Sequence, residues 1–375
     1  MASLKVLILG GRQCGKTSLL ASIFDSMRHG NTNEFLSACD KTQIKDQYLE
    51  RQQSLLSRRL YLEHIINKRN NSTFCIRYAP DHCYWNYIIE LRIPGTSKRM
   101  DVEFLDVPGS FLKCESFQFS YIASLVNEFD VIIVVVDTPY LMADCKEVVV
   151  SANAIHEIQY ILMQIDSQDT RKAKQILFAP VKCERWIKDG KIDEVTRKIE
   201  EIYSTTIQDF MASSNNGISI IPVETAGDII FSEFKDPYIL LNNQTISSVH
   251  CAKISDRIVL FTDGKMHRIT EDETLVADPG AVFDSWNKVI RPDEWFHLRN
   301  APKATYSPHN CEQLLLHIIR YKYLKATLKS SWFGTNSNNV FFGNILLNDI
   351  ADVLGRLSQA NMIKDSGEGI KVLRT

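Results

Sequence analysis

Short runs of β-branched and other apolar residues recur through residue 223, separated by longer segments in which apolar residues repeat every three or four positions. Runs without in/out alternation are typical of strands that helices cover on both faces, as in a parallel sheet. The pattern therefore predicts a three-layer α/β fold with a mostly parallel sheet. The predicted strands are Lys5–Leu9, Asp101–Leu105, Val131–Val136, Gln175–Ala179 and Ile218–Val223.

The stretch 31–98, between the first predicted helix and the strand at Asp101, is longer than such a fold requires, and we predict an insertion there. Apolar residues in its first part, Asp40–Lys68, recur at spacings of four and seven, which predicts an amphipathic helix or a pair of helices. Basic residues in this part indicate a solvated helix face or, alternatively, a contact to phosphate or lipid. These residues are Arg58, Arg59, Lys68 and Arg69, and the strand-like stretches Thr73–Tyr78 and Tyr87–Ile93 follow them.

After Val223 the pattern changes to short apolar segments separated by pairs such as Asn-Asn and Asp-Gly, which predict β-hairpins and loops. An apolar stripe in Cys311–Leu328 predicts a helix that closes the core. The helix-like Leu347–Gln359 precedes a turn-rich end, which indicates either a winged helix or a helix and hairpin packed on the body. The expected units are a core domain over 1–227, a β-rich insertion or accessory region over 228–304, and a mixed α+β C-terminal extension over 305–375.

Composition excludes several classes of protein. With 45% hydrophobic and 23% charged residues, the chain matches ordinary globular proteins and not disordered ones. A net charge of −2 gives no overall attraction to nucleic acid or anionic lipid. The nine cysteines are scattered without a Cys-x-x-Cys pair, so we expect neither a disulfide framework nor a zinc site. No apolar run approaches the roughly 20 residues that cross a bilayer, and we expect a cytoplasmic protein without a transmembrane segment.

Candidate chemistry begins directly after the first strand, with the sequence Gly10-Gly11-Arg12-Gln13-Cys14-Gly15-Lys16-Thr17. A Gly-x-x-x-x-Gly-Lys-Thr pattern between a strand and a helix predicts a phosphate-binding P-loop, because glycines let backbone N–H groups converge on phosphate oxygens. Lys16 is expected to bridge the β- and γ-phosphates, and the Thr17 hydroxyl to ligate Mg²⁺. The predicted phosphate-binding residues are Gly11, Gln13, Cys14, Gly15, Lys16, Thr17 and Ser18.

A second motif, Asp106-Val107-Pro108-Gly109, follows the second predicted strand. Asp-x-x-Gly by itself is a common turn. After a P-loop, one insertion and one strand, it predicts a sensor of the nucleotide state. Asp106 would bind Mg²⁺ through water, and the N–H of Gly109 would contact the γ-phosphate.

The ordered series of these two motifs with Val181-Lys182-Cys183-Glu184 and Glu224-Thr225-Ala226 resembles the motif series of Ras-like P-loop GTPases of the translation-factor-related (TRAFAC) class. The long insertion and the extended C-terminal part further resemble bacterial double-GTPase-like and YcjX-like proteins. The resemblance covers roughly residues 1–230. It implies GTP or GDP with Mg²⁺ as the ligand, and a molecular switch that acts on a protein effector or a co-encoded partner.

For the base, the resemblance implies that the stem of Lys182 packs along guanine while the carboxylate of Glu184 accepts hydrogen bonds from the ring N–H and the exocyclic amine. Glu184 has one methylene more than the usual aspartate, and Val181 stands where asparagine or threonine is usual. An ATP-binding enzyme is therefore the nearest alternative. Thr225 and Ala226 match the loop whose backbone amide contacts the base oxygen.

The switch threonine that completes the Mg²⁺ shell in such proteins is assigned here to Thr73, with Thr42 and Thr96 as alternatives. No sequence spacing separates the three, because the long insertion changes the usual distance from the P-loop.

Hydrolysis in Ras-like enzymes commonly uses a glutamine after Asp-x-x-Gly to orient water, where this chain has Ser110-Phe111. The candidate catalytic residues are Lys16, Ser110 and, unless it faces solvent, Arg12. We therefore predict a slow or partner-assisted GTPase. The alternatives are a non-hydrolysing scaffold that holds nucleotide structurally and, for the C-terminal segment, a winged-helix reader of nucleic acid.

Overall fold

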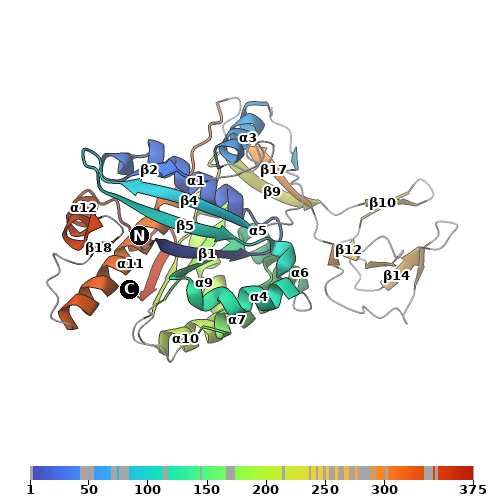
Figure 1. The fold of residues 1–375 in the computed structure, drawn as a ribbon. Helices are drawn as coiled ribbons and strands as arrows, with labels where there is room; N and C mark the ends of the chain where they lie inside the picture. The colour runs from blue at the N-terminus through green and yellow to red at the C-terminus, as the bar shows by residue number, and fades with distance from the viewer. Residues whose placement is uncertain are drawn as a thin grey trace.

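The computed structural model describes residues 3–42, 55–68, 74–75, 84–112, 117–143, 146–165, 174–212, 216–235, 238–241, 244–247, 251–252, 258–260, 266–269, 275–277, 289–290, 293–299, 303–332, 341–342 and 345–374. At its centre five strands run parallel (Figure 1), and these are the five predicted strands. In spatial order they are β5 (Arg99–Asp106), β1 (Leu4–Gly10), β6 (Val131–Asp137), β7 (Gln175–Val181) and β8 (Gly217–Ile220). The predicted α/β fold with a mostly parallel sheet is confirmed.

Antiparallel strands extend the central sheet at both edges. Beside β5 lie β4 (Trp85–Arg92) and then β2 (Ser37–Asp40), both from the predicted insertion after the first helix. Beside β8 lie β21 (Ile370–Arg374) and then β20 (Ser366–Gly367), which form the C-terminal hairpin. The hairpin completes the sheet and does not stand free as a wing, so the C-terminal helix and hairpin are packed on the body.

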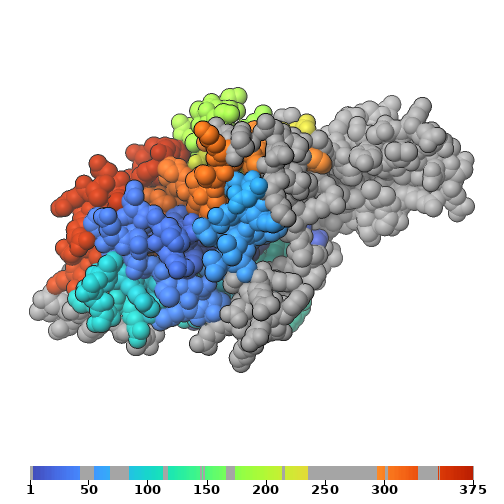
Figure 2. Space-filling model, turned by 90° about the horizontal axis from the view of Figure 1, so that it is seen from above, coloured from blue at the N-terminus to red at the C-terminus, as the bar shows by residue number. Residues whose placement is uncertain are grey.

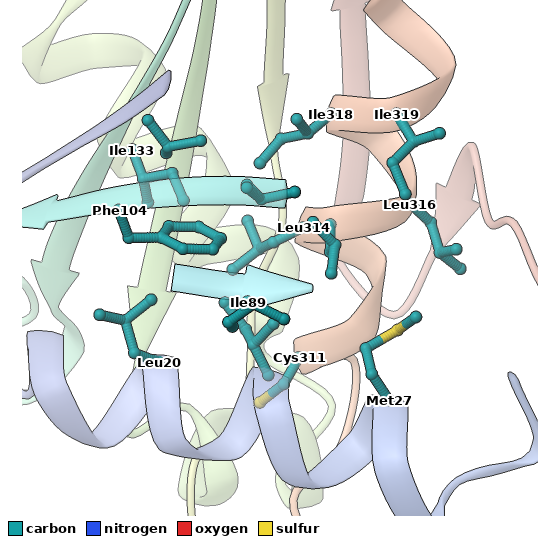
Figure 3. Close-up of a cluster of buried hydrophobic side chains, with 14 of the residues drawn as sticks. Leu20, Met27, Ile89, Phe104, Ile133, Cys311, Leu314, Leu316, Ile318 and Ile319 are labelled. Atoms are coloured by element: carbon teal, nitrogen blue, oxygen red, sulfur yellow. The ribbon is translucent and has the colours of Figure 1, made fainter. Parts of the chain in front are cut away.

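Two layers of helices cover the two faces of the sheet, because successive side chains of a strand point to opposite faces. Ile133 of β6 belongs to a cluster with the helices of one face, whereas Ile132 belongs to a cluster with the helices of the other face. The first face carries α1 (Lys16–His29), α11 (Cys311–Trp332) and α12 (Leu347–Gln359); the second carries α4 (Phe117–Leu125), α7 (Ile155–Met163), α9 (Ile192–Ile202) and α10 (Ser204–Ala212). Figure 3 shows side chains of α1, α11 and the strands gathered in the first cluster.

Helix α11 closes the core, as its apolar stripe predicts. Leu314, Leu315 and Ile318 have no exposed surface and pack in the cluster that α1 shares. The hydroxyl of Tyr321 donates a hydrogen bond of 2.8 Å to the carbonyl of Lys174, the residue before β7. The C-terminal part of the chain therefore packs directly on the elements that carry the P-loop.

The two regions that the sequence predicts as separate insertions meet in one small sheet. Strand β3 (Phe74–Cys75) from the first region pairs with β17 (Asp293–Leu298), which pairs with β9 (Ile229–Lys235) from the second. Helix α3 (Leu55–Lys68) joins them, since Ile66 packs with Phe231 and Phe296 in one apolar cluster. Figure 1 shows α3, β9 and β17 together at the top of the view.

The basic residues of α3 correct one interpretation. Nε of Arg59 lies 2.6 Å from Oδ1 of Asp25, and Nε of Arg58 donates to Oγ of Ser18 at 2.9 Å. Both side chains therefore face α1, and the solvated-face interpretation is wrong for them. Arg69 lies outside the described residues. Figure 2 shows α3, in light blue, at the surface of the molecule.

The region between β9 and β17 forms small separate sheets that lie beside the main body in Figure 1 and include the hairpins expected there. Its strands are β10 (Tyr238–Leu241), β11 (Gln244–Ser247), β12 (Cys251–Ala252), β13 (Ile258–Leu260), β14 (Met266–Ile269), β15 (Leu275–Ala277) and β16 (Val289–Ile290). The remaining elements are η1 (Asn31–Glu34), η2 (Gly109–Phe111), η3 (Val126–Glu128), α5 (Thr138–Leu141), α6 (Lys146–Asn153), α8 (Glu184–Lys188), β18 (Phe341–Phe342) and β19 (Ile345–Leu346).

Candidate nucleotide-binding site

The loop between β1 and α1 has the backbone that a phosphate cradle requires. Gln13 and Gly15 have positive φ angles of 60° and 107°, which turn the chain back on itself before the helix begins. Gly11 has no room for a side chain, because a Cβ there would lie 1.9 Å from the carbonyl oxygen of Ala152. The first turn of α1 contains no acidic side chain, so the partial positive charge of its N-terminus favours an anion.

Lys16 lies across this loop. Its ammonium donates hydrogen bonds to the carbonyl oxygens of Gly10 at 3.0 Å and Gly11 at 3.1 Å, and the residue is 7% exposed. A buried cation held by two neutral carbonyls in a loop of converging N–H groups provides a positive centre for phosphate oxygens. The predicted role of Lys16 is compatible with this placement.

A hydroxyl and a carboxylate from two different elements meet beside the loop. Oγ1 of Thr17, in α1, donates to Oδ2 of Asp106, at the end of β5, over 2.8 Å. They meet because β1 and β5 are parallel neighbours with their carboxyl ends at the same edge. Oxygen donors of these two kinds are the ligands that Mg²⁺ prefers, so the pair fits a magnesium ion that is also held by phosphates. The described residues contain no group of three or more His, Cys, Asp or Glu side chains arranged as a metal cage.

Gly109 touches the P-loop. A Cβ on Gly109 would lie 2.3 Å from the backbone nitrogen of Arg12 and 2.4 Å from the carbonyl carbon of Gly11, so this contact requires glycine. Ser110 follows in the short helix η2 and is half-buried, and Arg12 is exposed at the surface of the loop. The Asp-x-x-Gly segment is therefore in backbone contact with the loop whose ligand it is predicted to sense.

The two segments predicted to contact the base line one cavity together with residues of the P-loop and the start of α1. Lys182 and Glu184 follow β7, Thr225 and Ala226 follow β8, and the N–H of Ala226 donates to Oε1 of Glu184 at 3.4 Å. Parallel neighbouring strands explain why segments so far apart in sequence converge. The sequence-predicted residues that line the cavity are Gly15, Ser18, Lys182, Glu184, Thr225 and Ala226.

Glu184 has an unusual environment for a carboxyl group. Burial raises its pKa to about 8, and the nearby charge of Glu224 also raises it, against the opposing effects of the Ala226 N–H and Arg299. Among the described residues, Oε2 of Glu184 is buried without a hydrogen-bond partner. Once Glu184 is deprotonated, this oxygen at the cavity wall would accept a hydrogen bond from a ligand N–H, a donor that the ring of guanine has and that of adenine lacks.

Four further residues line the cavity that sequence reasoning did not identify. They come from the two insertions, and no spacing pattern connects them to the motifs. Oε2 of Glu294 lies 2.5 Å from Nζ of Lys182, whose other carboxylate partner is Asp137 at 2.7 Å. The four residues are Leu62 in α3, Ile229 in β9, and Glu294 and Phe296 in β17.

The candidate switch threonines are placed differently. Thr73 lies outside the described residues. Thr96 belongs to the turn between β4 and β5, at the opposite end of β5 from Asp106. Seven strand steps of about 3.3 Å put Arg99, the first residue of β5, roughly 23 Å from Asp106. Thr96 lies beyond Arg99 and therefore far from the Thr17–Asp106 pair, so the Thr96 alternative is wrong. Thr42 accepts a hydrogen bond from the N–H of Ile88 at 3.1 Å, nearer the Asp106 end of the sheet.

No protein-family model and no curated protein sequence matches this chain. Among solved structures, the chain is similar to the signal recognition particle receptor SRb-GTP/SRX complex from Chaetomium thermophilum, with 11% identity, a TM-score of 0.35, and coverage of 61% of this chain and 93% of that chain. It is also similar to the GTPase-like domain of S. cerevisiae Ski7 bound to GTP, with 10% identity, a TM-score of 0.34, and coverage of 80% and 71%. Similarities at such low identity and TM-score support no conclusion about this chain. The fold assignment rests on the observed strand order.

Proposed function

We propose that this chain binds GTP or GDP with Mg²⁺ and works as a slow or partner-assisted GTPase switch. The observation that carries the proposal is one cavity on which the P-loop, the Lys182–Glu184 segment and the Thr225–Ala226 loop converge. The Thr17–Asp106 hydrogen bond lies beside the same P-loop. A triphosphate at the loop and a guanine at the cavity would use every motif of the series.

Each residue would contribute a distinct part of the chemistry. Lys16 would bind the β- and γ-phosphate oxygens, and the N–H groups of the P-loop would orient them. Bound Mg²⁺, held by Thr17 and by Asp106 through water, would supply positive charge to the phosphates. Thr73 is the proposed third protein ligand. Gly109, in contact with the loop, would report whether the γ-phosphate is present.

Slow hydrolysis follows from the residues after Gly109. The ring of Phe111 packs edge-to-face on Tyr84, with centroids 5.0 Å apart, and has no group that orients water. Ser110 has only a short hydroxyl for that purpose, and Arg12 is exposed at the surface of the loop, so it is not assigned a role in the transition state. A protein that holds nucleotide without hydrolysing it is the second candidate, and the position of Phe111 is what favours it.

A partner would reach the sensor through α4. On this helix Phe117 is 82% exposed and Tyr121 is 48% exposed, an aromatic content typical of protein interfaces. Tyr121 stacks edge-on with Tyr84 at 6.4 Å, and Tyr84 contacts Phe111. A protein bound there would contact the segment that follows Asp-x-x-Gly. Among the described residues, no helix combines the length and the apolarity needed to cross a membrane.

Competition against a fluorescent GDP analogue tests the guanine proposal. We expect GTP and GDP to displace it at concentrations at least 100-fold below those of ATP, because adenine leaves the Glu184 carboxylate without its donors. Displacement by ATP as effective as that by GTP would contradict the proposal.

Phosphate release distinguishes the second candidate, a protein that holds nucleotide without hydrolysing it. The rate of phosphate release from GTP is compared between wild type and Lys16→Ala, with candidate partners present. A non-hydrolysing protein would bind GTP tightly, yet its rate of phosphate release would not exceed that of Lys16→Ala.

The pH dependence of binding tests the role of Glu184. Because the pKa of free Glu184 is raised to about 8, guanine binding to the carboxylate requires loss of a proton below that pH. Affinity should therefore rise with pH, by up to about tenfold per unit, and level off above 8. GDP phosphate also titrates, so the measured quantity is the difference between the dissociation constants of wild type and Glu184→Gln from pH 6 to 9. Parallel pH profiles would contradict this role.

The same shift affects stability with the opposite sign. A folded-state pKa above the ordinary glutamate value of 4.5 means that the folded chain holds the proton more tightly than the unfolded chain. The contribution of Glu184 to the free energy of unfolding is then full below pH 4.5 and is lost as pH rises towards 8. Chemical denaturation without nucleotide measures this contribution, again against Glu184→Gln.

A further inference from the structure

We propose that helix α3 and the strands β3, β17 and β9 form a lid over the base cavity that controls nucleotide access and release, with Glu294 as its contact to Lys182. The inference rests on the proposed function and concerns the regulation of the same site.

The lid is assembled from both insertions. In its sheet, β17 lies in the middle and pairs antiparallel with β3 on one side and with β9 on the other. Phe296 of β17 and Phe231 of β9 pack with Ile66 of α3, so the helix and the sheet share one apolar cluster. The cluster also contains Ala226 of the base loop, which places the lid directly against the cavity.

Glu294 connects the lid to the residue predicted to lie along the base. The side chains of Lys182 and Glu294 are each 12% exposed, and the pair is 2.5 Å apart. The Phe296 ring lies on the same side, with its centroid 5.9 Å from Nζ of Lys182. Lys182 lies between two carboxylates, Asp137 at the end of β6 and Glu294 of β17, and burial strengthens the attraction between Lys182 and Glu294. β17 is therefore held against the body at the base site.

Helix α3 makes a second connection, to the P-loop end of α1. Leu62 lines the cavity, and Arg58 donates to the hydroxyl of Ser18, the residue after Thr17. Arg59 pairs with Asp25 further along α1. The lid thus contacts the base side through Lys182 and the phosphate side through Ser18.

The narrowness of the cavity is what suggests that the lid moves. The cavity volume of about 30 Å³ accommodates roughly two or three water molecules, which is less than a purine ring fills. The P-loop, β7 and β8 are parts of the central sheet and its packed core. The lid strands lie outside that sheet. Moving them would enlarge the cavity and disturb the packed core less than moving the P-loop, β7 or β8 would.

Movement of the lid would also reach the base loop. Strand β9 begins at Ile229, directly after Ala226, Gly227 and Asp228. Gly227 has a φ of 74°, a left-handed conformation that suits a change of direction between loop and strand. Because the loop continues into the lid, opening of the lid would displace Ala226 from Glu184, and both base contacts would loosen together.

Stopped-flow measurement of fluorescent GDP binding and release tests the lid. We expect slow exchange in wild type and an increase of at least tenfold in both rate constants in Glu294→Gln, because the variant loses the charge that attracts β17 to Lys182, while Asp137 still compensates Lys182. The matched control is Glu194→Gln, which makes the same change of side chain. Glu194 is an exposed glutamate of α9, outside the lid, and its rates should stay within twofold of wild type.

Wild-type amide hydrogen exchange gives a readout that does not depend on a variant folding. GDP should change the protection of the β17 amides, whereas those of the central strand β6 should not respond. Unchanged rates in Glu294→Gln together with unchanged β17 protection, in a chain that binds GDP, would overturn the lid and leave the proposed function intact. If no guanine nucleotide binds to wild type or to Glu294→Gln, the proposed function fails and the lid with it.

Discussion

Replacing Lys16 with alanine is expected to weaken GDP and GTP binding by about 100-fold or more, since a charge-assisted hydrogen bond contributes roughly 1.5–3 kcal/mol and Lys16 would make at least two with the phosphates. Its ammonium already lies within the loop, 3.0 Å from the Gly10 carbonyl and 3.1 Å from that of Gly11. Titration calorimetry with GDP and excess Mg²⁺ measures the effect.

Lys5→Ala serves as the matched control for Lys16→Ala. Lys5 is an exposed residue of β1, the strand that leads into the loop. Its removal changes the net charge equally but should leave the dissociation constant within twofold. Binding by Lys16→Ala within threefold of wild type, in a variant with an unchanged unfolding transition, would show that the nucleotide phosphates do not lie on this loop.

Removing the C-terminal residues from 303 onward is expected to abolish cooperative folding of the remaining chain, including the P-loop. Helix α11 supplies buried apolar side chains to the cluster that also contains α1 and the central strands. Strand β21 covers the edge of β8, which would otherwise present unpaired backbone groups. Far-ultraviolet circular dichroism and urea denaturation of the truncated chain measure the outcome, and a cooperative transition at the wild-type midpoint would contradict the expectation.

A point substitution gives the same test without truncation. Leu314→Ala should lower the free energy of unfolding by about 2–5 kcal/mol, because it leaves a cavity in a closely packed core. Leu314 has no exposed surface, whereas Leu324, on the same helix, is 38% exposed. Leu324→Ala should cost less than about 1 kcal/mol. Equal effects of the two substitutions would mean that α11 is not packed on the core as described.

The strands and motifs were accessible to sequence reasoning because their signals are local. A strand covered on both faces must be apolar throughout, as Val131–Asp137 is, and a P-loop needs its glycines at fixed spacing. The ends of the strands were predicted less accurately than their positions, since β8 ends at Ile220 and not at Val223. Helix α12 spans Leu347–Gln359, as its periodicity predicts.

Contacts between residues that are distant in the sequence could not be predicted from the sequence. Arg58 and Arg59 look like a solvated face in the sequence, because the pattern does not contain Ser18 and Asp25, the groups on α1 that they contact. The C-terminal hairpin resembles a wing because its pairing with β8 joins segments more than a hundred residues apart. Glu294 belongs to no recognisable sequence motif, and its proposed role rests on its contact with Lys182.

By itself, the sequence determined the α/β class, the central strands and the order of motifs that fits a triphosphate, since these depend on periodicity and short fixed spacings. Only the tertiary structure decided that Thr17 meets Asp106, that Glu184 is buried with a raised pKa, and that two insertions join at the cavity that Glu184 lines. The contacts, burial and charge environment of a side chain depend on which distant segments the fold brings together. The local pattern of apolar and polar residues in a single sequence does not predict those long-range contacts.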